Sequence, residues 1–199
     1  GTNMPLPFPD ALQEFKVDTS TQNASSGTHS GAQVNSVTKS GGNQLHGDAF
    51  EFFRNYDLNA RNFFAAQRDT LKRNQFGGVI GGPIKKDRVW FYFLGYYRGQ
   101  EQTIPGMFYN KNAFDPTKWG YVPDTSRPAL SGGRGPLQPA VRMTMQLTQR
   151  DKLNLYWDEQ ISNNSLGAGS ATAAPETGGR NHGWQRVQQV KWTSTATNK

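Results

Sequence analysis

Residues 74–98 read NQFGGVIGGPIKKDRVWFYFLGYYR, and this stretch decides the fold. Residues 75–84 are rich in glycine, whereas residues 89–98 are almost all β-branched or aromatic, which favours strands. The polar residues 85–88 between them have the length and composition of a tight turn. The stretch therefore predicts a β-hairpin.

The second strand of this hairpin is apolar on both faces. Because successive side chains of a strand alternate, Val89, Phe91, Phe93 and Tyr97 share one face, and Trp90, Tyr92, Leu94 and Tyr96 share the other. Such a strand is either buried on both sides or has one face in lipid. The Tyr and Trp rings favour lipid, because they suit a membrane–water boundary. The central strand of a soluble sheet explains this stretch equally well.

The composition favours strands of alternating polarity. The chain has 199 residues, enough for one domain, but only 34% are hydrophobic, while 12% are aromatic and 22 are glycine. Alternating strands produce this combination. Disordered segments are also poor in hydrophobic residues, but they are poor in aromatic residues as well.

Charge and cysteine content exclude several kinds of site. The net charge is +7, but lysine and arginine are scattered, which indicates turns and loops rather than a nucleic-acid surface. Without cysteine there is no disulfide, cysteine nucleophile or thiolate metal site. No apolar run has the length of a transmembrane helix. Residues 1–10 lack signal-peptide features, so we expect any export signal to have been removed or to lie upstream.

Two short strands precede the hairpin. Residues 11–19 alternate in polarity, with Phe15 and Val17 expected to face inward. Residues 31–39 predict a second strand, followed by a turn at residues 40–43. Later strands are predicted at residues 47–54, 140–148, 153–160 and 184–193.

The connections between the later strands alternate in length. Long ones are predicted at residues 55–73, 99–138 and 161–183, and residues 58–67 are expected to include a short helix. Residues 85–88 and 149–151 are short turns. Alternating short turns and long loops are typical of an outer-membrane barrel. The predicted fold is all-β: a partial transmembrane antiparallel β-barrel of about six strands, each of about ten residues.

No motif indicates an enzyme. The glycines of residues 77–82 lack the Lys-Ser/Thr of a phosphate loop and favour a close approach within a strand. His29, His46 and His182 stand alone, without a second ligand at metal spacing. Asp158 and Glu159 are adjacent in a strand, so they point to opposite faces and cannot act as an acid–base pair.

Several segments match a known family: residues 11–17 (ALQEFKV), 31–39 (GAQVNSVTK), 40–47 (SGGNQLHG), 58–64 (LNARNFF) and 73–84 (RNQFGGVIGGPI). The chain resembles TonB-dependent outer-membrane receptors, most closely the Oar-like subset. The resemblance is specific over residues 5–98 and looser afterwards. Within residues 31–39, the closing segment of the family's plug domain, Ala32, Gln33 and Ser36 depart from the pattern.

The resemblance implies a barrel of roughly 22 strands with a plugged lumen. Residues 1–45 would be the C-terminal part of the plug, and residues 46–199 the first part of the barrel, with the long loops outside the cell. The chain would then be a fragment of a Gram-negative receptor. The implied partners are TonB with ExbB and ExbD, acting through an upstream TonB box, together with outer-membrane lipid. The implied ligand is a siderophore, cobalamin, carbohydrate or peptide, and no cofactor is implied.

Candidate site residues follow from position and from the resemblance. Position alone assigns Tyr56, Asn59, Arg61 and Arg98, together with residues 99–138, to ligand binding. The resemblance implies that a movable plug gate contains Phe15, Val17, Gly31, Asn35, Thr38 and Lys39. We expect no catalytic residue and no metal ligand. A passive adhesion or structural β-protein, or a basic soluble nucleic-acid binder, remains an alternative to a transport receptor.

Overall fold

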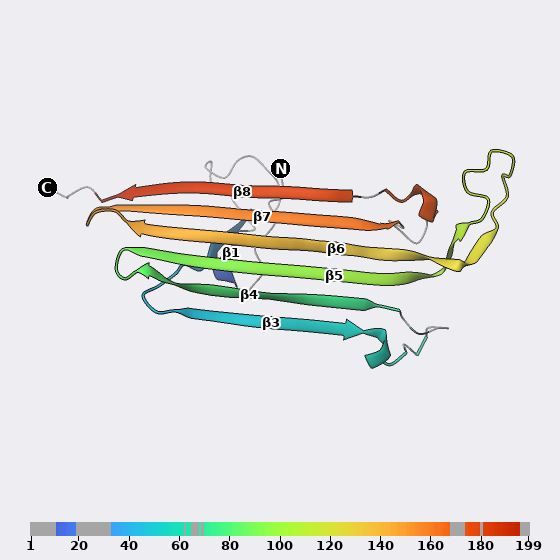
Figure 1. The fold of residues 1–199 in the computed structure, drawn as a ribbon, viewed down its shortest axis with the longest axis horizontal. Helices are drawn as coiled ribbons and strands as arrows, with labels where there is room; N and C mark the ends of the chain where they lie inside the picture. The colour runs from blue at the N-terminus through green and yellow to red at the C-terminus, as the bar shows by residue number, and fades with distance from the viewer. Residues whose placement is uncertain are drawn as a thin grey trace.

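The computed structural model describes residues 11–18, 33–61, 63–64, 68, 70–167, 174–179 and 181–195. These residues form two antiparallel sheets. In the smaller sheet, β1 (Leu12–Asp18) pairs with β2 (Gln33–Thr38). The larger sheet has six strands in sequence order (Figure 1): β3 (His46–Asn55), β4 (Lys72–Lys85), β5 (Val89–Asn110), β6 (Pro123–Gln146), β7 (Asp151–Gly167) and β8 (Asn181–Ser194).

The connections alternate in length, as the sequence predicts. Residues 86–88 and 147–150 are short turns at one end of the sheet, and the long connections that follow β3, β5 and β7 leave from the other end (Figure 1). Two single-turn 3-10 helices, η3 (Tyr56–Leu58) and η4 (Pro175–Thr177), lie in the first and last of these long connections. The all-β fold with six strands in the larger sheet is confirmed.

The prediction that residues 99–138 form an irregular connection is wrong. β5 continues to Asn110 and β6 begins at Pro123, so only residues 111–122 connect them. The prolines that argue against a strand lie near irregular pairing: Pro105 falls between Thr103 and Phe108, where the register shifts, and Pro136 lies beside another shift. A bulge leaves a residue outside the ladder, so it accommodates a residue without a backbone donor.

Three smaller expectations are also corrected. The strands of the larger sheet have 10 to 24 residues rather than about ten. Residues 161–183 are mostly strand at both ends, because β7 reaches Gly167 and β8 begins at Asn181. The short helix expected at residues 58–67 is absent from the described part of that range, where η3 ends at Leu58.

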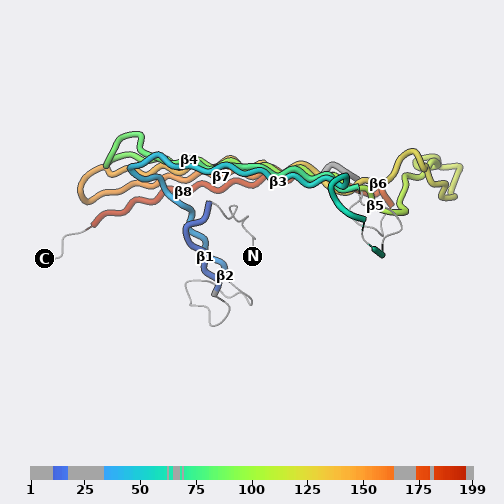
Figure 2. Tube along the Cα trace, turned by 90° about the horizontal axis from the view of Figure 1, so that it is seen from below, coloured from blue at the N-terminus to red at the C-terminus, as the bar shows by residue number. Residues whose placement is uncertain are grey.

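The β1–β2 hairpin projects from one face of the larger sheet (Figure 2). We call the face that it contacts the inner face, and the opposite one the outward face. Phe15 and Val17 are 52% and 44% exposed, so the expectation that both face inward is wrong. A two-stranded hairpin has no core of its own, and no other described element packs over Phe15 and Val17. The buried residues of the hairpin segment lie at its base: Ala11 at 0% exposure and Thr38 at 5%.

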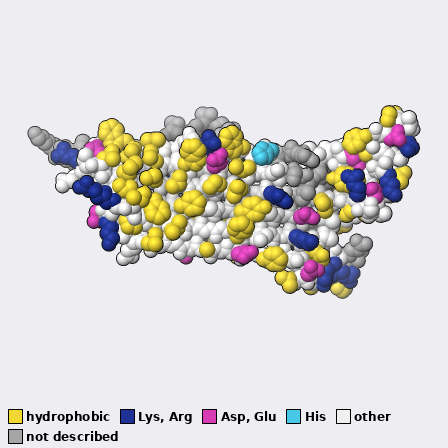
Figure 3. All heavy atoms as spheres, viewed as in Figure 1, with side chains coloured by type: hydrophobic (Ala, Val, Ile, Leu, Met, Phe, Trp, Pro, Cys, Tyr) yellow, Lys and Arg dark blue, Asp and Glu magenta, His cyan; other side chains and the backbone are white. Residues whose placement is uncertain are grey.

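The outward face is apolar. Figure 3 views this face and shows hydrophobic side chains gathered over its central part, with charged side chains at both ends, toward the short turns and toward the long loops. The strand register places ten exposed large side chains on it: Phe53, Phe76, Ile80, Phe93, Leu137, Val141, Trp157, Trp184, Val190 and Trp192. A water-soluble sheet hides its apolar face, whereas this one presents it, as a lipid-facing barrel wall does.

The outward apolar region has the height of a membrane. The nine residues 89–97 span about 30 Å at ~3.3 Å per residue, and a tilt of about 40° reduces this to roughly 23 Å, close to the ~25 Å apolar band of such barrels. On β8, Trp184 and Trp192 lie eight residues apart on this face. Their indole N–H groups donate to Glu159 at 2.7 Å and to Asp151 at 3.3 Å, as expected of interfacial girdle residues.

Glycines let the inner face pack closely. A Cβ atom added to Gly81 would lie 2.6 Å from Cδ2 of Tyr92, and one added to Gly77 would lie 2.9 Å from Cζ of Phe50. The rings therefore lie over the bare backbone of β4. This confirms the prediction that the glycines among residues 77–82 are structural and lie within a strand. Tyr92, Leu94, Val79, Ala140 and Ala11 form the buried cluster beneath the hairpin.

The outward face provides a stability test. Val141, which is 37% exposed in the apolar region, and Val122, which is 44% exposed in a long connection, are matched in residue type and exposure. We expect Val141→Arg to lower the free energy of unfolding in lipid vesicles, measured by urea titration, by about 2–4 kcal/mol. Val122→Arg should change it by less than about 0.5 kcal/mol. Equal small effects would show that the face is in water.

Candidate functional site

The inner face carries a polar network opposite the apolar face. Gln138 and Asp158 are 2% and 3% exposed, and Nε2 of Gln138 donates to both carboxylate oxygens of Asp158 at 3.1 and 3.2 Å. The hydroxyl of Tyr156 donates to the same carboxylate at 3.0 Å. The buried charge is therefore held by several hydrogen bonds, as a buried carboxylate must be.

The side chains of the adjacent residues Asp158 and Glu159 point to opposite faces of the sheet, as predicted. Asp158 faces the inner network, while Glu159 faces outward and forms an ion pair with Arg186 at 3.0 Å. The guanidinium of Arg186 lies over the rings of Trp157 and Trp184, at 4.7 and 4.6 Å from their centroids. Pairing and stacking neutralise the charges on the apolar face, and the two carboxylates share no site.

Arg142 connects the sheet to the hairpin. Its side chain lies on the inner face of β6, with the guanidinium 5.3 Å from the ring centroid of Tyr156, and Nη1 donates to the carbonyl oxygen of Thr38 at 2.9 Å. The backbone N–H of Lys39 donates to the carbonyl of Ala11 at 2.8 Å. The base of the hairpin thus rests on the sheet through one charged hydrogen bond and the small buried side chain of Ala11.

The linker between the hairpin and the larger sheet is anchored to the β4–β5 turn. The side-chain oxygen of Asn43 accepts from the backbone N–H of Asp87 at 3.0 Å and from the indole N–H of Trp90 at 2.7 Å. A Cβ added to Gly41 would lie 2.1 Å from the carbonyl oxygen of Phe91, so the linker backbone passes directly against β5. Residue 41 therefore needs to be glycine.

The predicted gate residues do not form one cluster. Thr38 is 5% exposed and reaches the sheet through its carbonyl, and Lys39 closes the hairpin base. Asn35, Phe15 and Val17 are exposed along the hairpin. Gly31 lies outside the described residues.

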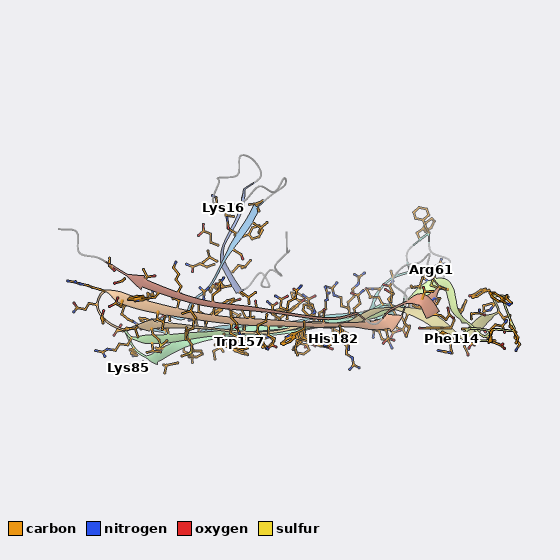
Figure 4. The ribbon with its side chains drawn as sticks, turned by 90° about the horizontal axis from the view of Figure 1, so that it is seen from above. Lys16, Arg61, Lys85, Phe114, Trp157 and His182 are labelled. Atoms are coloured by element: carbon orange, nitrogen blue, oxygen red, sulfur yellow. The ribbon has the colours of Figure 1, made fainter. Side chains whose placement is uncertain are left out.

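The predicted ligand residues are divided between a loop and the sheet. Tyr56 and Asn59 lie in and just after η3, where the N–H of Asn59 donates to Tyr56 at 3.1 Å. Figure 4 shows Arg61 at the same long-loop end, far from Lys85 at the other end. Arg98 instead lies within β5 opposite Gln75, and its Nε donates to the carbonyl of Gly135 at 3.4 Å. Arg98 therefore belongs to the wall.

A cavity lies at the outer ends of β5 and β6. It has a volume of about 510 Å³ and lies between the β5–β6 connection and η4. The guanidinium of Arg127 lies 4.6 Å from the ring centroid of Tyr109, and the backbone N–H of Asn110 donates to the carboxylate of Glu176. Cationic, anionic and aromatic groups thus line one hollow within residues 99–138 and 174–179. Part of residues 99–138 therefore lines a cavity, and their assignment to ligand binding stays a prediction.

The described residues hold no group of three or more His, Asp or Glu side chains that could bind a metal ion. His46 lies with Nδ1 3.0 Å from the carbonyl of Gln44, and His182 is exposed. His29 lies outside the described residues. The arrangement offers binding and docking contacts rather than a constellation for covalent chemistry.

Sequence reasoning missed Arg142 and Asn43 as contact residues. Arg142 lies in the strand predicted at residues 140–148, and a cation on the inner face of a barrel strand is a usable signal. Its partner is a backbone carbonyl 104 residues away, which no sequence pattern records. Asn43 was recognised only as a turn residue.

Comparisons with known proteins agree with this geometry. Residues 37–121 match the family described as "Outer membrane beta barrel domain". The combination of that match with an apolar outward face decides the location. The chain lies in the outer membrane. Over 74 residues it is 32% identical to the TonB-dependent transporter Oar of Myxococcus xanthus, a match that covers 33% of this chain and 7% of that transporter.

No solved structure matches the chain. Among the described residues, no helix is long and apolar enough to cross a membrane. The family match is to an outer-membrane barrel domain, and the similar protein is a transporter.

The contact of Arg142 with the hairpin can be tested by cysteine labelling, because the chain has no cysteine. A cysteine introduced as Ala11→Cys should react slowly with a maleimide, since this position is buried. Arg142→Ala should raise the labelling rate about tenfold or more, because hydrogen bonds of charged groups are worth ~1.5–3 kcal/mol. Arg150→Ala, in an exposed turn, is the control. An unchanged rate in Arg142→Ala would show that this contact does not hold the hairpin.

Proposed function

We propose that this chain forms part of a TonB-dependent outer-membrane receptor of the Oar-like kind. In this proposal β1 and β2 are the end of the plug, and β3 to β8 are the first strands of a larger barrel whose long connections face outside. The observation that carries it is a sheet with an apolar outward face and a small hairpin docked on its polar inner face. The resemblance of residues 5–98 and the similarity to Oar support the same assignment.

The proposed mechanism is binding followed by gated translocation. Ligand binds at the outer end, where the cavity beside Tyr109, Arg127 and Glu176 and the connection after β3 lie. TonB, energised through ExbB and ExbD, then rearranges the plug. The hairpin suits a movable part, because Arg142 and Ala11 hold its base while Phe15 and Val17 remain exposed. Because few contacts hold the hairpin on the sheet, a coupled energy source can supply the free energy needed to break them.

A passive surface protein is the alternative, since a barrel wall alone does not require energy coupling. The two hypotheses differ in whether the activity depends on TonB. The soluble nucleic-acid binder is not retained, because the outward face is apolar and the chain lies in the outer membrane.

Uptake measurements test the proposal. Cells lacking the gene and cells lacking TonB are compared with the parent for uptake of four labelled probes: an iron-loaded siderophore, cyanocobalamin, an oligosaccharide and an oligopeptide. We expect uptake of one probe to fall to background in both mutants, and Arg127→Ala to reduce it. Uptake lost without the gene but unaffected by loss of TonB would contradict energised transport. No loss for any probe would contradict the receptor assignment to these ligand classes.

A further inference from the structure

The outward face contains a hollow that is not apolar. It has a volume of about 520 Å³ and lies on β4, β5 and β6, on the long-loop side of Tyr97. Gly99, which has no side chain, lies between Asn74 of β4 and Arg134 of β6 in the register. The hollow therefore opens toward lipid at the height where the apolar region ends, and the side chains around it determine what it binds.

Two cations line this hollow without a carboxylate partner among the described residues, although the ammonium of Lys72 lies 5.7 Å from the ring centroid of Tyr56. Neither Lys72 nor Arg134 forms an ion pair with a carboxylate of the described residues; Glu101 lies opposite Lys72 in the register but is not paired with it. Arg73 also lines the hollow, but its guanidinium donates to Oε1 of Gln75 at 2.8 Å. Cations at a membrane boundary attract anionic lipid headgroups, and Lys and Arg both bind phosphate.

A buried acceptor points to a second feature of the ligand. Oδ1 of Asn74, which lines the same hollow, is buried and has no hydrogen-bond partner among the described residues. An unsatisfied buried acceptor is costly, and a phosphate or carboxylate cannot supply the missing donor. A hydroxyl or amide N–H of a sugar headgroup can.

An apolar groove continues from the hollow toward the membrane interior. Gly78 and Gly95 are directly paired and form its floor, while Phe76, Tyr97, Ile80 and Phe93 form its walls. Its volume is about 440 Å³, and Tyr97 lines both the groove and the hollow. The rings of Phe76 and Tyr97 lie 5.2 Å apart at the junction. The width and apolar lining of such a groove suit an acyl chain.

We propose that the hollow and the groove together bind one lipid, a phosphorylated glycolipid of the outer leaflet. Lys72 and Arg134 bind its phosphate, Asn74 accepts from its sugar, and an acyl chain lies over Gly78 and Gly95. This inference rests on the proposed function only in placing the long connections outside the cell. The lipid anchors the barrel wall and is not the transported ligand.

Native mass spectrometry of the protein in detergent tests the site. The probes are bis-phosphorylated lipid A, the same lipid without phosphates, and phosphatidic acid, an anionic lipid whose phosphate carries neither a sugar nor an alcohol group. We expect the parent protein to retain phosphorylated lipid A best. The double variant Lys72→Gln/Arg134→Gln should weaken its binding about thirty-fold, because each basic residue contributes roughly fivefold. Glu101→Gln should strengthen it, because a repelling carboxylate is removed.

Matched variants separate the site from general charge effects. Lys86→Gln/Arg88→Gln removes two positive charges from the short turn at the opposite end of the sheet and should leave binding unchanged. Gly95→Leu fills the groove and should weaken binding of both forms of lipid A; an added Cβ there meets only Phe93, at 3.6 Å, so the strand tolerates it.

Three results would overturn the proposal: unchanged binding by the Lys72→Gln/Arg134→Gln variant, equal retention of dephosphorylated lipid A, or phosphatidic acid bound as well as phosphorylated lipid A. Because this assay needs neither TonB nor a transported ligand, its failure leaves the uptake result standing. Likewise, a lack of TonB-dependent uptake leaves the lipid-binding result standing.

Discussion

The structure depends on one constraint, the contact between the outward face of the sheet and hydrocarbon. No water is available there, so backbone polar groups must bond within the strand ladder, and side chains that face lipid must be apolar or neutralised. The strands β4 to β7, each of which pairs with a neighbour on both sides, satisfy the first condition within the sheet. Phe93 and Val141 satisfy the second, and the Glu159–Arg186 pair shows how a charge is accommodated between tryptophan rings.

The same constraint explains the inner face. Once the apolar side chains point outward, polar side chains must gather inside, where Asp158 is held by Gln138 and Tyr156. This surface can hold a second element by hydrogen bonds rather than by a large hydrophobic contact. The hairpin docks there through Arg142. An element held in this way can be stable at rest and still be released, and the proposed plug function needs both properties.

The glycines of β4 contribute to both faces. Gly77 and Gly81 let the rings of Phe50 and Tyr92 lie against the backbone inside, while Gly78, paired with Gly95, leaves the groove outside. Larger side chains at residues 77 and 81 would push the aromatic rings away from the sheet. A glycine-rich strand beside an aromatic one is therefore a packing device.

Much of the fold could be predicted from the sequence because alternation is local. Alternation along residues 89–97 correctly places Phe93 and Leu94 on opposite faces of the strand. Only the contact of the sheet with Ala11 shows which of the two faces is the inner one. Residues 99–138 could not be predicted, because Pro105 and Pro136 suppress the strand signal while bulges and the pairing of distant residues maintain the sheet. Of the candidate site, Thr38 and Lys39 could be assigned to the plug only through the resemblance. The contact of Arg142 could not be predicted, because its partner is set by tertiary docking.

A nitroxide scan of β5 tests the central claim most directly. Single cysteines at residues 89–97 of the cysteine-free protein would be spin-labelled in membranes, and collisions with oxygen and with a water-soluble nickel chelate would be measured. The structure predicts a period of two, with labels at Val89, Phe91, Phe93 and Tyr97 reached by oxygen and protected from nickel. Labels at Phe91 and Phe93 that nickel reaches as readily as a loop label would contradict a lipid-facing sheet.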